Sequence, residues 1–289
     1  MKHYLLYTLS LYSLLIAAPY LHATLGAWSY LIVPLLASFF IIGIGLLRHE
    51  HWHRYDKEIN NTLFHHLCSF AMLSDTNCYL HGHLSHHKHV HTEHDLELYG
   101  PGYSDLTAAQ KRNRFLLEAV LGNIHWELTT GHYLAAKNLV TRKEIITSIA
   151  GRAAFIAVLF TVTYFLYNGS AALTVAAHFA LSIWVAAVVS RHLQWIQHLG
   201  IFVDHKDPKE RSLQTRALLN CGLLEKTFNV WTHTEGENHI FHHTDVLTPI
   251  TSVRTMKLEA TAPAINLKDY LQIILSYYRR VGAPVQEKA

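Results

Sequence analysis

The sequence contains few charged residues. Asp, Glu, Lys and Arg make up only 16% of its 289 residues, whereas hydrophobic residues make up 50%. Soluble domains usually carry roughly 25% charged residues, so this chain either buries an unusually large core or lies in a bilayer. The net charge of +3 is too small to indicate a nucleic-acid-binding protein. Because no linker rich in Pro, Gly or Ser divides the chain, we expect a single domain over residues 1–289.

Cysteine is also scarce. The three cysteines, Cys68, Cys78 and Cys221, are an odd number, and none of them has C-x-x-C spacing. This pattern indicates neither a disulfide framework nor a zinc or iron–sulfur site made from cysteine. The sequence contains no haem or flavin motif either. We therefore expect no electron store within the chain itself.

Long apolar stretches occur four times in this weakly charged chain. Each approaches the roughly 20 residues that a helix needs to cross the hydrocarbon core of a bilayer. Because the first stretch is long and a second follows after a short turn, we expect an anchor helix and not a cleaved signal peptide. The predicted spans cover about 4–20, 28–47, 149–167 and 171–189.

Loop charge predicts the orientation of these spans. The short loops 22–27 and 168–170 contain neither Lys nor Arg, whereas basic residues gather at the opposite ends of the spans. Cytoplasmic loops carry an excess of Lys and Arg, so residues 48–148 and 190–289 are expected on the cytoplasmic side. The predicted fold is an all-α integral membrane protein with four transmembrane helices in two hairpins. A histidine-rich cytoplasmic cap of interfacial helices completes it.

Histidine is the residue in excess. The chain has 24 histidines, as many as Lys and Arg together, and histidine is the commonest metal ligand. They gather in three boxes, which all fall on the predicted cytoplasmic side. In the first box, His49 and His53 are four residues apart and share one face of a continued helix. The other two boxes repeat the spacing H-x-x-H-H: His83, His86 and His87, and then His239, His242 and His243.

Other histidines have no such repeated spacing. His198 follows the fourth span, with Gln194 one turn earlier on the same face, and a lone histidine at a helix end is usually solvated or caps the helix. His178, in the middle of a span, is expected to pack inside the helix bundle. The remaining histidines that we expect to be structural are His65, His66, His125, His132, His192, His205 and His233.

The three boxes indicate a site for two metal ions. A structural zinc site needs only four ligands, and imidazole suits iron, copper and nickel as well as zinc. Iron fits best, because redox chemistry explains a site at a membrane surface that apolar substrate reaches from lipid. Two alternatives are a membrane-embedded zinc metalloprotease, since His49-Glu50-x-x-His53 satisfies H-E-x-x-H, and a divalent-metal transporter. The protease leaves two boxes unexplained, and transporters usually place ionisable ligands within the spans.

At these boxes the sequence resembles the membrane-bound fatty acid desaturase and hydroxylase superfamily, which includes the alkane monooxygenases. His49-Glu50-x-x-His53-Arg54 is similar to the alkane monooxygenase box H-E-x-x-H-K. Gln194-x-x-Gln197-His198-x-Gly200 is similar to its element N-Y-x-E-H-Y-G. His86-His87-x-x-Val90-x-Thr92-x-x-Asp95 resembles the tail of its second box, and His239-x-x-His242-His243 matches its closing box. The resemblance covers residues 48–249.

The chain departs from the alkane monooxygenases at several points. Its second box has the H-x-x-H-H spacing of acyl desaturases, and glutamines occupy the Asn and Glu positions of the element around His198. Four spans fit the acyl desaturase plan, whereas alkane monooxygenases carry six. The resemblance therefore leaves desaturation and hydroxylation both open.

The resemblance implies an O2-dependent oxidoreductase with two non-haem iron ions, which acts on a fatty-acyl lipid or hydrocarbon chain entering from the bilayer. One of His81, His89 and His91 could replace His83 as a ligand. Candidates to orient the ligand imidazoles are Glu50, Asp95, Gln194 and Glu237. The implied iron ligands are His49, His53, His83, His86, His87, His198, His239, His242 and His243.

An external electron donor is a further expectation. Because the sequence carries no electron store, a ferredoxin, rubredoxin or cytochrome b5-like protein is required as partner. The basic residues on the predicted cytoplasmic side suit the docking of an acidic protein. The expected location is the bacterial inner membrane, with the metal site on its cytoplasmic face.

Overall fold

The structure is a computed structural model in which helices predominate. It describes residues 2–53, 61–167, 169–233, 239–240, 243 and 263–281, and at residues 50–53 and 61–62 it describes the backbone alone. The contacts divide the chain into two compact units. Unit 1 comprises Met1–Tyr79 and Leu134–Val189, and unit 2 comprises Leu80–Tyr133 and Ser190–Ala289.

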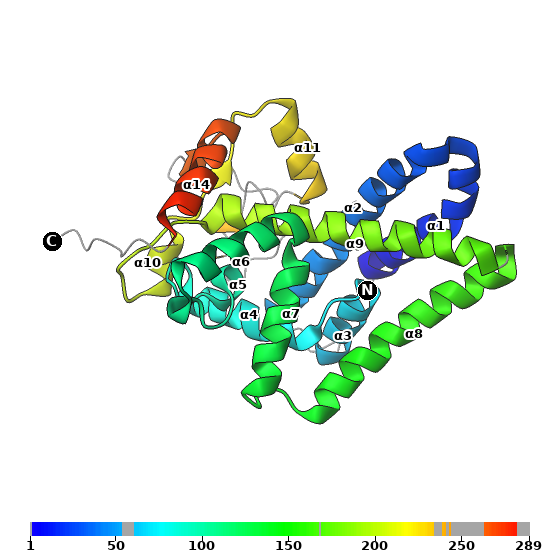
Figure 1. Cartoon of the computed structure of the whole chain (residues 1–289), viewed down its shortest axis with the longest axis horizontal. Helices are drawn as coiled ribbons and strands as arrows, with labels where there is room; N and C mark the ends of the chain where they lie inside the picture. The colour runs from blue at the N-terminus through cyan, green and yellow to red at the C-terminus, as the bar shows by residue number, and fades with distance from the viewer. Residues whose placement is uncertain are drawn as a thin grey trace. The chain divides into compact units, whose positions relative to one another are not determined.

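Unit 1 begins with two apolar helices that pack against each other (Figure 1). They are α1 (Lys2–Leu25) and α2 (Ser29–His53), joined by the short 3-10 helix η1 (Gly26–Trp28). Gly26 has a φ of +57°, a left-handed conformation that glycine adopts at little cost because it lacks a Cβ atom. This position lets the chain reverse between the two helices.

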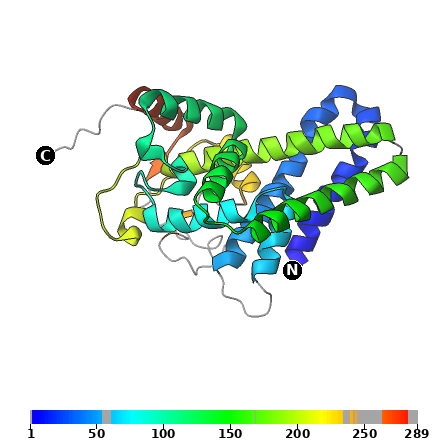
Figure 2. The same cartoon turned by 60° about the horizontal axis from the view of Figure 1, so that its bottom comes forward.

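The second pair of long helices in sequence is α8 (Arg142–Tyr167) and α9 (Gly169–His198). Only residue 168 separates them, and the two helices diverge from this junction in both Figure 1 and Figure 2. α3 (Asn61–Ala71) packs along α8, and α1 contacts α8 as well. The two helices of the predicted second hairpin are therefore joined by a short connection, as expected. Their packing against each other stays a prediction.

Three segments of the described chain are long and apolar enough to cross a membrane, namely Lys2–His49, Arg142–Tyr167 and Gly169–His198. Each of the predicted spans falls within one of them, and the first two predicted spans share Lys2–His49. The apolar and helical character of the spans is confirmed. Their number, four, stays a prediction.

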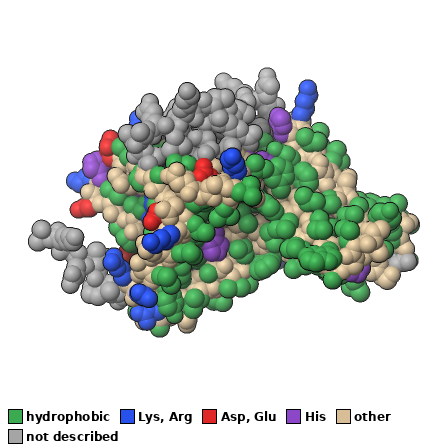
Figure 3. Space-filling view, turned by 90° about the horizontal axis from the view of Figure 1, so that it is seen from above, with side chains coloured by type: hydrophobic (Ala, Val, Ile, Leu, Met, Phe, Trp, Pro, Cys, Tyr) green, Lys and Arg blue, Asp and Glu red, His purple; other side chains and the backbone are tan. Residues whose placement is uncertain are grey.

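The long helices of unit 1 expose large apolar side chains. Phe165 is 80% exposed and Leu173 is 77% exposed, which water would penalise and lipid would not. Figure 3 shows hydrophobic side chains over much of one face of the molecule. Inside the unit, His178 is completely buried; its Nδ1 donates to the carbonyl of Thr174 at 2.7 Å, and its Nε2 lies 3.2 Å from Ser29 Oγ. The structural role predicted for His178 is confirmed.

Unit 2 consists mostly of shorter helices, and capping boxes begin two of them. Thr107 caps α6 together with Gln110, and Asn266 caps α14 together with Asp269, which satisfies backbone N–H groups that a helix start leaves unpaired. The elements are the larger part of α4 (Thr76–His89), α5 (Leu96–Tyr99), η2 (Tyr103–Asp105), α6 (Ala108–Leu121), α7 (Asn123–Ala136), the end of α9, α10 (Pro208–Ser212), α11 (Leu223–Trp231) and α14 (Leu267–Arg280).

A short parallel strand pair was not part of the predicted all-α fold. β1 (Ala217–Leu218) pairs with β2 (Ala264–Ile265), so that Ala217 faces Ala264 and Leu218 faces Ile265. Leu218 is buried in the hydrophobic core of the unit. The pair therefore joins two segments that are far apart in the sequence, and it modifies the predicted all-α class only locally.

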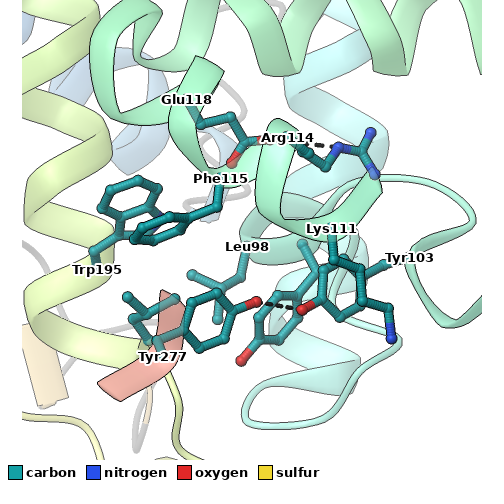
Figure 4. A pocket seen from close by; sticks show the side chains of 10 residues that line it. Leu98, Tyr103, Lys111, Arg114, Phe115, Glu118, Trp195 and Tyr277 are labelled. Carbon is teal, nitrogen blue, oxygen red and sulfur yellow. Dashed lines mark hydrogen bonds and ion pairs between the residues drawn. The ribbon is translucent and has the colours of Figure 1, made fainter. Parts of the chain in front are cut away.

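An aromatic core fixes the end of α9 inside unit 2. The ring of Trp195 on α9 stacks on the ring of Phe115 on α6, with centroids 4.4 Å apart, and Trp195 is only 1% exposed. Figure 4 shows this stack, and next to it the hydroxyl groups of Tyr103 and Tyr277 hydrogen-bond to each other. Stacked aromatic rings add to the free energy gained from burial. The helix turn that precedes His198 is thereby held in place.

A buried ion pair fixes the same helix end from another side. Arg191 on α9 is completely buried, and its guanidinium donates to the carboxylate of Glu118 and to the backbone carbonyls of Glu97 and Leu98. Burial opposes the charge of Glu118, but Arg191, together with His125 and Arg114, outweighs it and holds the pKa of Glu118 below its usual value. Arg191 therefore ties α5 to α9.

A close helix contact in unit 2 provides a test of the fold. A Cβ atom added to Gly82 on α4 would lie 2.5 Å from the ring of Trp126, whereas one added to Gly45 on α2 would lie 3.6 Å from Met72 Sδ, an ordinary contact. We expect Gly82→Ala to destabilise the protein by about 1–3 kcal/mol, and Gly45→Ala to change little. Thermal unfolding of the detergent-solubilised variants measures the difference. Equal stability of the two variants would contradict the packing of Trp126 on α4.

Candidate metal centre

One face of α4 carries the second histidine box. His83, His86 and His87 are three and four residues apart, so the helical repeat brings them to the same side. His83 is 3% exposed and His86 is 5% exposed, and His87 is half-buried. Imidazoles that are buried together in this way need either hydrogen-bond partners or a metal ion.

Four histidines of unit 2 converge on one point. His86 from α4, His198 from the end of α9, and His239 and His243 from the third box each offer a ring nitrogen, and these nitrogens all lie within 4.8 Å of one another. Three of the four residues are buried and His239 is half-buried. The spacing of the boxes in the sequence predicted a common site, and the structure brings these histidines together from three separate segments.

A second contact extends the group along α4. His83 Nε2 and His87 Nε2 are 3.0 Å apart. The ring centroid of His87 lies 5.0 Å from that of His243 and 5.9 Å from that of His86. The described histidines of the second and third boxes therefore form one continuous group of rings with His198.

Asp95 holds the ring of His86. Its Oδ2 lies 2.7 Å from His86 Nδ1, while its Oδ1 accepts from the backbone N–H groups of Glu97 and Leu98 and so caps the start of α5. Asp95 is completely buried. A carboxylate can only accept, so the proton of the neutral imidazole lies on Nδ1, and Nε2 keeps a lone pair for the interior of the cluster.

Glu97 holds the ring of His83 in the same way. Its Oε2 lies 3.0 Å from His83 Nδ1, and its Oε1 accepts from Gln194 Nε2 at 2.7 Å. The amide of Gln194 is oriented by Arg191, which donates to Gln194 Oε1 at 2.9 Å. Burial raises the pKa of Glu97, and the two donors, His83 and Gln194, favour its charged form. Such carboxylate–histidine pairs are typical of metal sites.

The facing nitrogens of the cluster explain why the site suits a cation. His86 Nε2 and His243 Nε2 are 3.1 Å apart, and His243 Nε2 and His239 Nε2 are 2.8 Å apart. Because His86 carries its proton on Nδ1, its facing nitrogen bears a lone pair. His198 Nε2 is also buried, and it has no hydrogen-bond partner among the residues that the structure describes. A metal ion would accept these lone pairs together.

The surroundings shift the pKa values of His86 and His243 in opposite directions. Burial, together with the neighbouring His239, lowers the pKa of His243 well below its usual value, so this ring is neutral. Burial also opposes protonation of His86, but Asp95 outweighs it and raises the pKa of His86. A neutral imidazole is the form that binds a metal, and a carboxylate behind it makes it a stronger base.

The proposed substitutes for His83 lie outside the cluster. His91 contacts the far side of His198, with its Nε2 3.0 Å from His198 Nδ1. His89 has its ring 6.0 Å from that of His94. The structure groups neither of these, nor His81, with the clustered nitrogens among the described residues, whereas His83 contacts His87. This arrangement favours His83 over the three alternatives.

The first box lies in unit 1. His49 is 6% exposed, near the end of α2, beside Arg48. Arg48 is buried as well, and its guanidinium donates to Ser69 Oγ at 3.0 Å and to Ser74 Oγ at 2.9 Å, which fixes the helix next to His49. The predicted residues whose side chains lie outside the described part of the chain are His53, His242, Glu50 and Glu237.

Three residues with a role in the site were not identified from the sequence. Glu97 could have been found, because it follows Asp95 at a spacing that puts both carboxylates at the start of one short helix. No sequence signal identified Arg191, and His91 was predicted only as a possible substitute for His83. The histidines expected to be structural belong to no metal-binding group in the described part of the chain.

A comparison with known families identifies a match. The sequence model of the fatty acid desaturase family matches residues 25–268, a range that includes every predicted ligand from His49 to His243. No curated protein matches the chain in a sequence search. The match covers most of the chain and all the elements that carry the clustered histidines.

The contact between Asp95 and His86 predicts a loss of metal affinity in Asp95→Asn. Asparagine caps a helix as well as aspartate does, so α5 should survive, while the charge behind His86 is lost. We expect the affinity for a divalent metal to fall about 10- to 100-fold, measured by competition with a chelator. Asp105→Asn, which changes an exposed carboxylate of unit 2, should bind as the wild type does. Equal affinities of the two variants would show that Asp95 does not act on a bound metal.

Proposed function

The chain belongs to the fatty acid desaturase family, and on that premise we propose that it is a membrane-bound, non-haem di-iron oxygenase. Membership in the family implies an oxidoreductase. The proposed substrate is a fatty-acyl lipid or hydrocarbon chain that enters from the bilayer. The proposed reaction is an O2-dependent desaturation or hydroxylation of this chain.

One observation carries the proposal. The nitrogens of His86, His198, His239 and His243 converge within 4.8 Å in the interior of unit 2. Carboxylates behind His86 and His83 keep the protons of both rings on the side that faces away from the cluster. This arrangement supports metal binding by the boxes that the family match covers.

Imidazole nitrogens in this number fit iron, and two ions account for a ligand set that exceeds the needs of one. When bound, the irons would supply the activation of O2 and the removal of hydrogen from an unactivated C–H bond. The ligands that we propose are His49, His53, His83, His86, His87, His198, His239, His242 and His243.

The other groups of the site hold protons and exclude water. Asp95 and Glu97 hold the Nδ1 protons of His86 and His83, and Arg191 fixes the stretch of chain to which both carboxylates belong. Because Asp95 and Arg191 are completely buried, bulk water does not compete for these hydrogen bonds. No additional side chain is needed as an acid or base for the oxidation of a C–H bond.

The alternatives account for less of the molecule. A zinc protease with His49-Glu50-x-x-His53 would use the first box, and it leaves the group of His86, His198, His239 and His243 without a role. A transporter needs ionisable ligands within its spans, and the clustered histidines lie in unit 2, with His198 at the last residue of α9. The convergence of these histidines favours the oxygenase.

The reaction requires two electrons from outside the chain. Desaturation turns a C–C single bond into a double bond and reduces O2 to two waters, whereas hydroxylation inserts one oxygen atom and releases one water. Both consume two electrons and two protons besides the O2. We propose that a ferredoxin, rubredoxin or cytochrome b5-like protein donates these electrons. Loop charge supports its docking at the cytoplasmic face of a bacterial inner membrane.

Metal content is the first test of this proposal. Detergent-purified protein should contain about two irons per chain, because its imidazole-rich ligand set exceeds the needs of a single ion. His243→Ala should lose iron and activity, since His243 contacts both His86 and His239. His132→Ala, which removes an exposed histidine of unit 2, is the matched control and should retain both.

The same measurement separates the alternatives. One tightly bound zinc per chain would favour the protease, and loosely held, exchangeable zinc without iron would favour the transporter. Full iron content and activity in His243→Ala would overturn the ligand assignment.

Product analysis determines the reaction type. The iron-loaded protein is incubated with O2, a reducing ferredoxin system and either a long-chain acyl substrate or an alkane. The family and the second-box spacing lead us to expect oxidation of the acyl substrate, detected as alkene or alcohol by mass spectrometry. Consumption of the alkane alone would contradict an acyl-lipid substrate.

A further inference from the structure

His91 has an unusual backbone conformation for a histidine. It lies in the turn after α4 with a φ of +59°, and it is completely buried. Non-glycine residues with positive φ are uncommon, and such conformations persist where the surroundings enforce them. Here the carbonyl of His91 accepts from the backbone N–H of Val203 at 3.1 Å. The ring is therefore fixed from both its backbone and its side chain.

Two hydrogen bonds determine which nitrogen of His91 carries the proton. His91 Nδ1 lies 2.7 Å from the backbone carbonyl oxygen of Arg211, which can only accept, so Nδ1 carries a proton. The ring is completely buried, and its two hydrogen-bond partners, a carbonyl and an imidazole, carry no negative charge. Because a buried charge without an opposite partner is costly, the ring is neutral. A neutral imidazole has only one ring proton, so His91 Nε2 bears a lone pair.

The lone pair of His91 also determines the protonation of His198. His91 Nε2 lies 3.0 Å from His198 Nδ1, and since the nitrogen of His91 accepts, His198 Nδ1 must donate. The proton of His198 therefore lies on Nδ1. Its Nε2 keeps a lone pair, and this is the buried nitrogen that has no hydrogen-bond partner among the described residues.

Arg211 makes this arrangement rigid. It is 5% exposed, and its guanidinium donates to the carbonyls of Val90, His205 and Lys88 at 2.8, 2.6 and 2.5 Å. These bonds close the turn around His91 and hold the Arg211 carbonyl against its ring. Hydrogen bonds thus connect the Arg211 backbone through His91 to His198 in the interior of the cluster.

We propose that His91 is a positioning residue that keeps His198 in the Nδ1–H form, with Nε2 directed at a bound metal. This inference rests on the proposed function, because it presupposes a metal at the cluster. A neutral imidazole accepts less strongly than a carboxylate. His198 is consequently a weaker base than His86, which Asp95 holds, so the protein gives the two ligands different electron-donating power.

A matched pair of substitutions tests the proposal. Glutamine and methionine have similar length, and only glutamine offers a carbonyl that can accept from His198 Nδ1. We expect His91→Met to lower the affinity for Co(II) about 10- to 100-fold and to change its visible absorption spectrum. We expect His91→Gln to recover most of the affinity. The readouts are chelator competition and absorption of the cobalt-loaded protein, so neither depends on activity.

A second buried histidine provides the control for lost hydrogen bonds. His192 on α9 bonds to Tyr270 Oη at 2.6 Å and to the carbonyl of Ala119 at 3.2 Å, outside the cluster. His192→Met therefore loses two bonds, as His91→Met does, and should keep the affinity of the wild type. Wild-type affinity and spectrum in His91→Met, or equal losses in the glutamine and methionine variants, would overturn the role of His91.

A further test uses the wild-type protein, so it does not depend on whether any variant folds. With 15N-labelled histidine, NMR of the metal-free protein reports the tautomer of each ring, and we expect the Nδ1–H form at His198. An Nε2–H form there would contradict the proposal. Failure of the wild-type protein to bind any metal would instead overturn the proposed function, so the two failures are distinguishable.

Discussion

A neutral imidazole has one ring proton, and the group that accepts this proton decides which nitrogen remains available to a metal. In unit 2 the accepting groups are Asp95, Glu97 and His91, all in the turn and the short helix that follow α4. They are buried or nearly so, and water cannot replace their hydrogen bonds without a large cost. The orientation of the clustered histidines therefore depends on the conformation of this one stretch of chain.

The rest of unit 2 keeps that stretch in place. Arg191 connects this stretch to α6 and α9, because its single guanidinium donates to Glu118, to the carbonyls at the start of α5 and to the amide of Gln194. The stack of Phe115 on Trp195 fixes the same helix end through apolar burial. Polar and apolar contacts thus act on one turn of α9, and this turn leads directly to His198.

The regular repeat of the α-helix and the scarcity of charged residues made part of this structure predictable from the sequence. The spacing of His83, His86 and His87 predicted a common face of a helix, and long apolar runs predicted the segments that can span a membrane. The role of His91 was not predictable, because it depends on a left-handed turn that follows no periodicity. Glu97 acts through a side-chain contact across that turn. The packing of α3 along α8 was not predicted either, since hydropathy indicates the length of a span and not the helix against which it packs.

The two-residue pairing of β1 with β2 has a thermodynamic consequence. It closes a segment that runs from Ala217 to Ile265 and contains His239 and His243, and closing a segment costs conformational entropy that rises with its length. An ion held by His86 together with His239 and His243 would divide the same segment into shorter closed parts. Strand pairing and ion binding would then share one entropic cost, so that each lowers the cost of the other and the two form cooperatively.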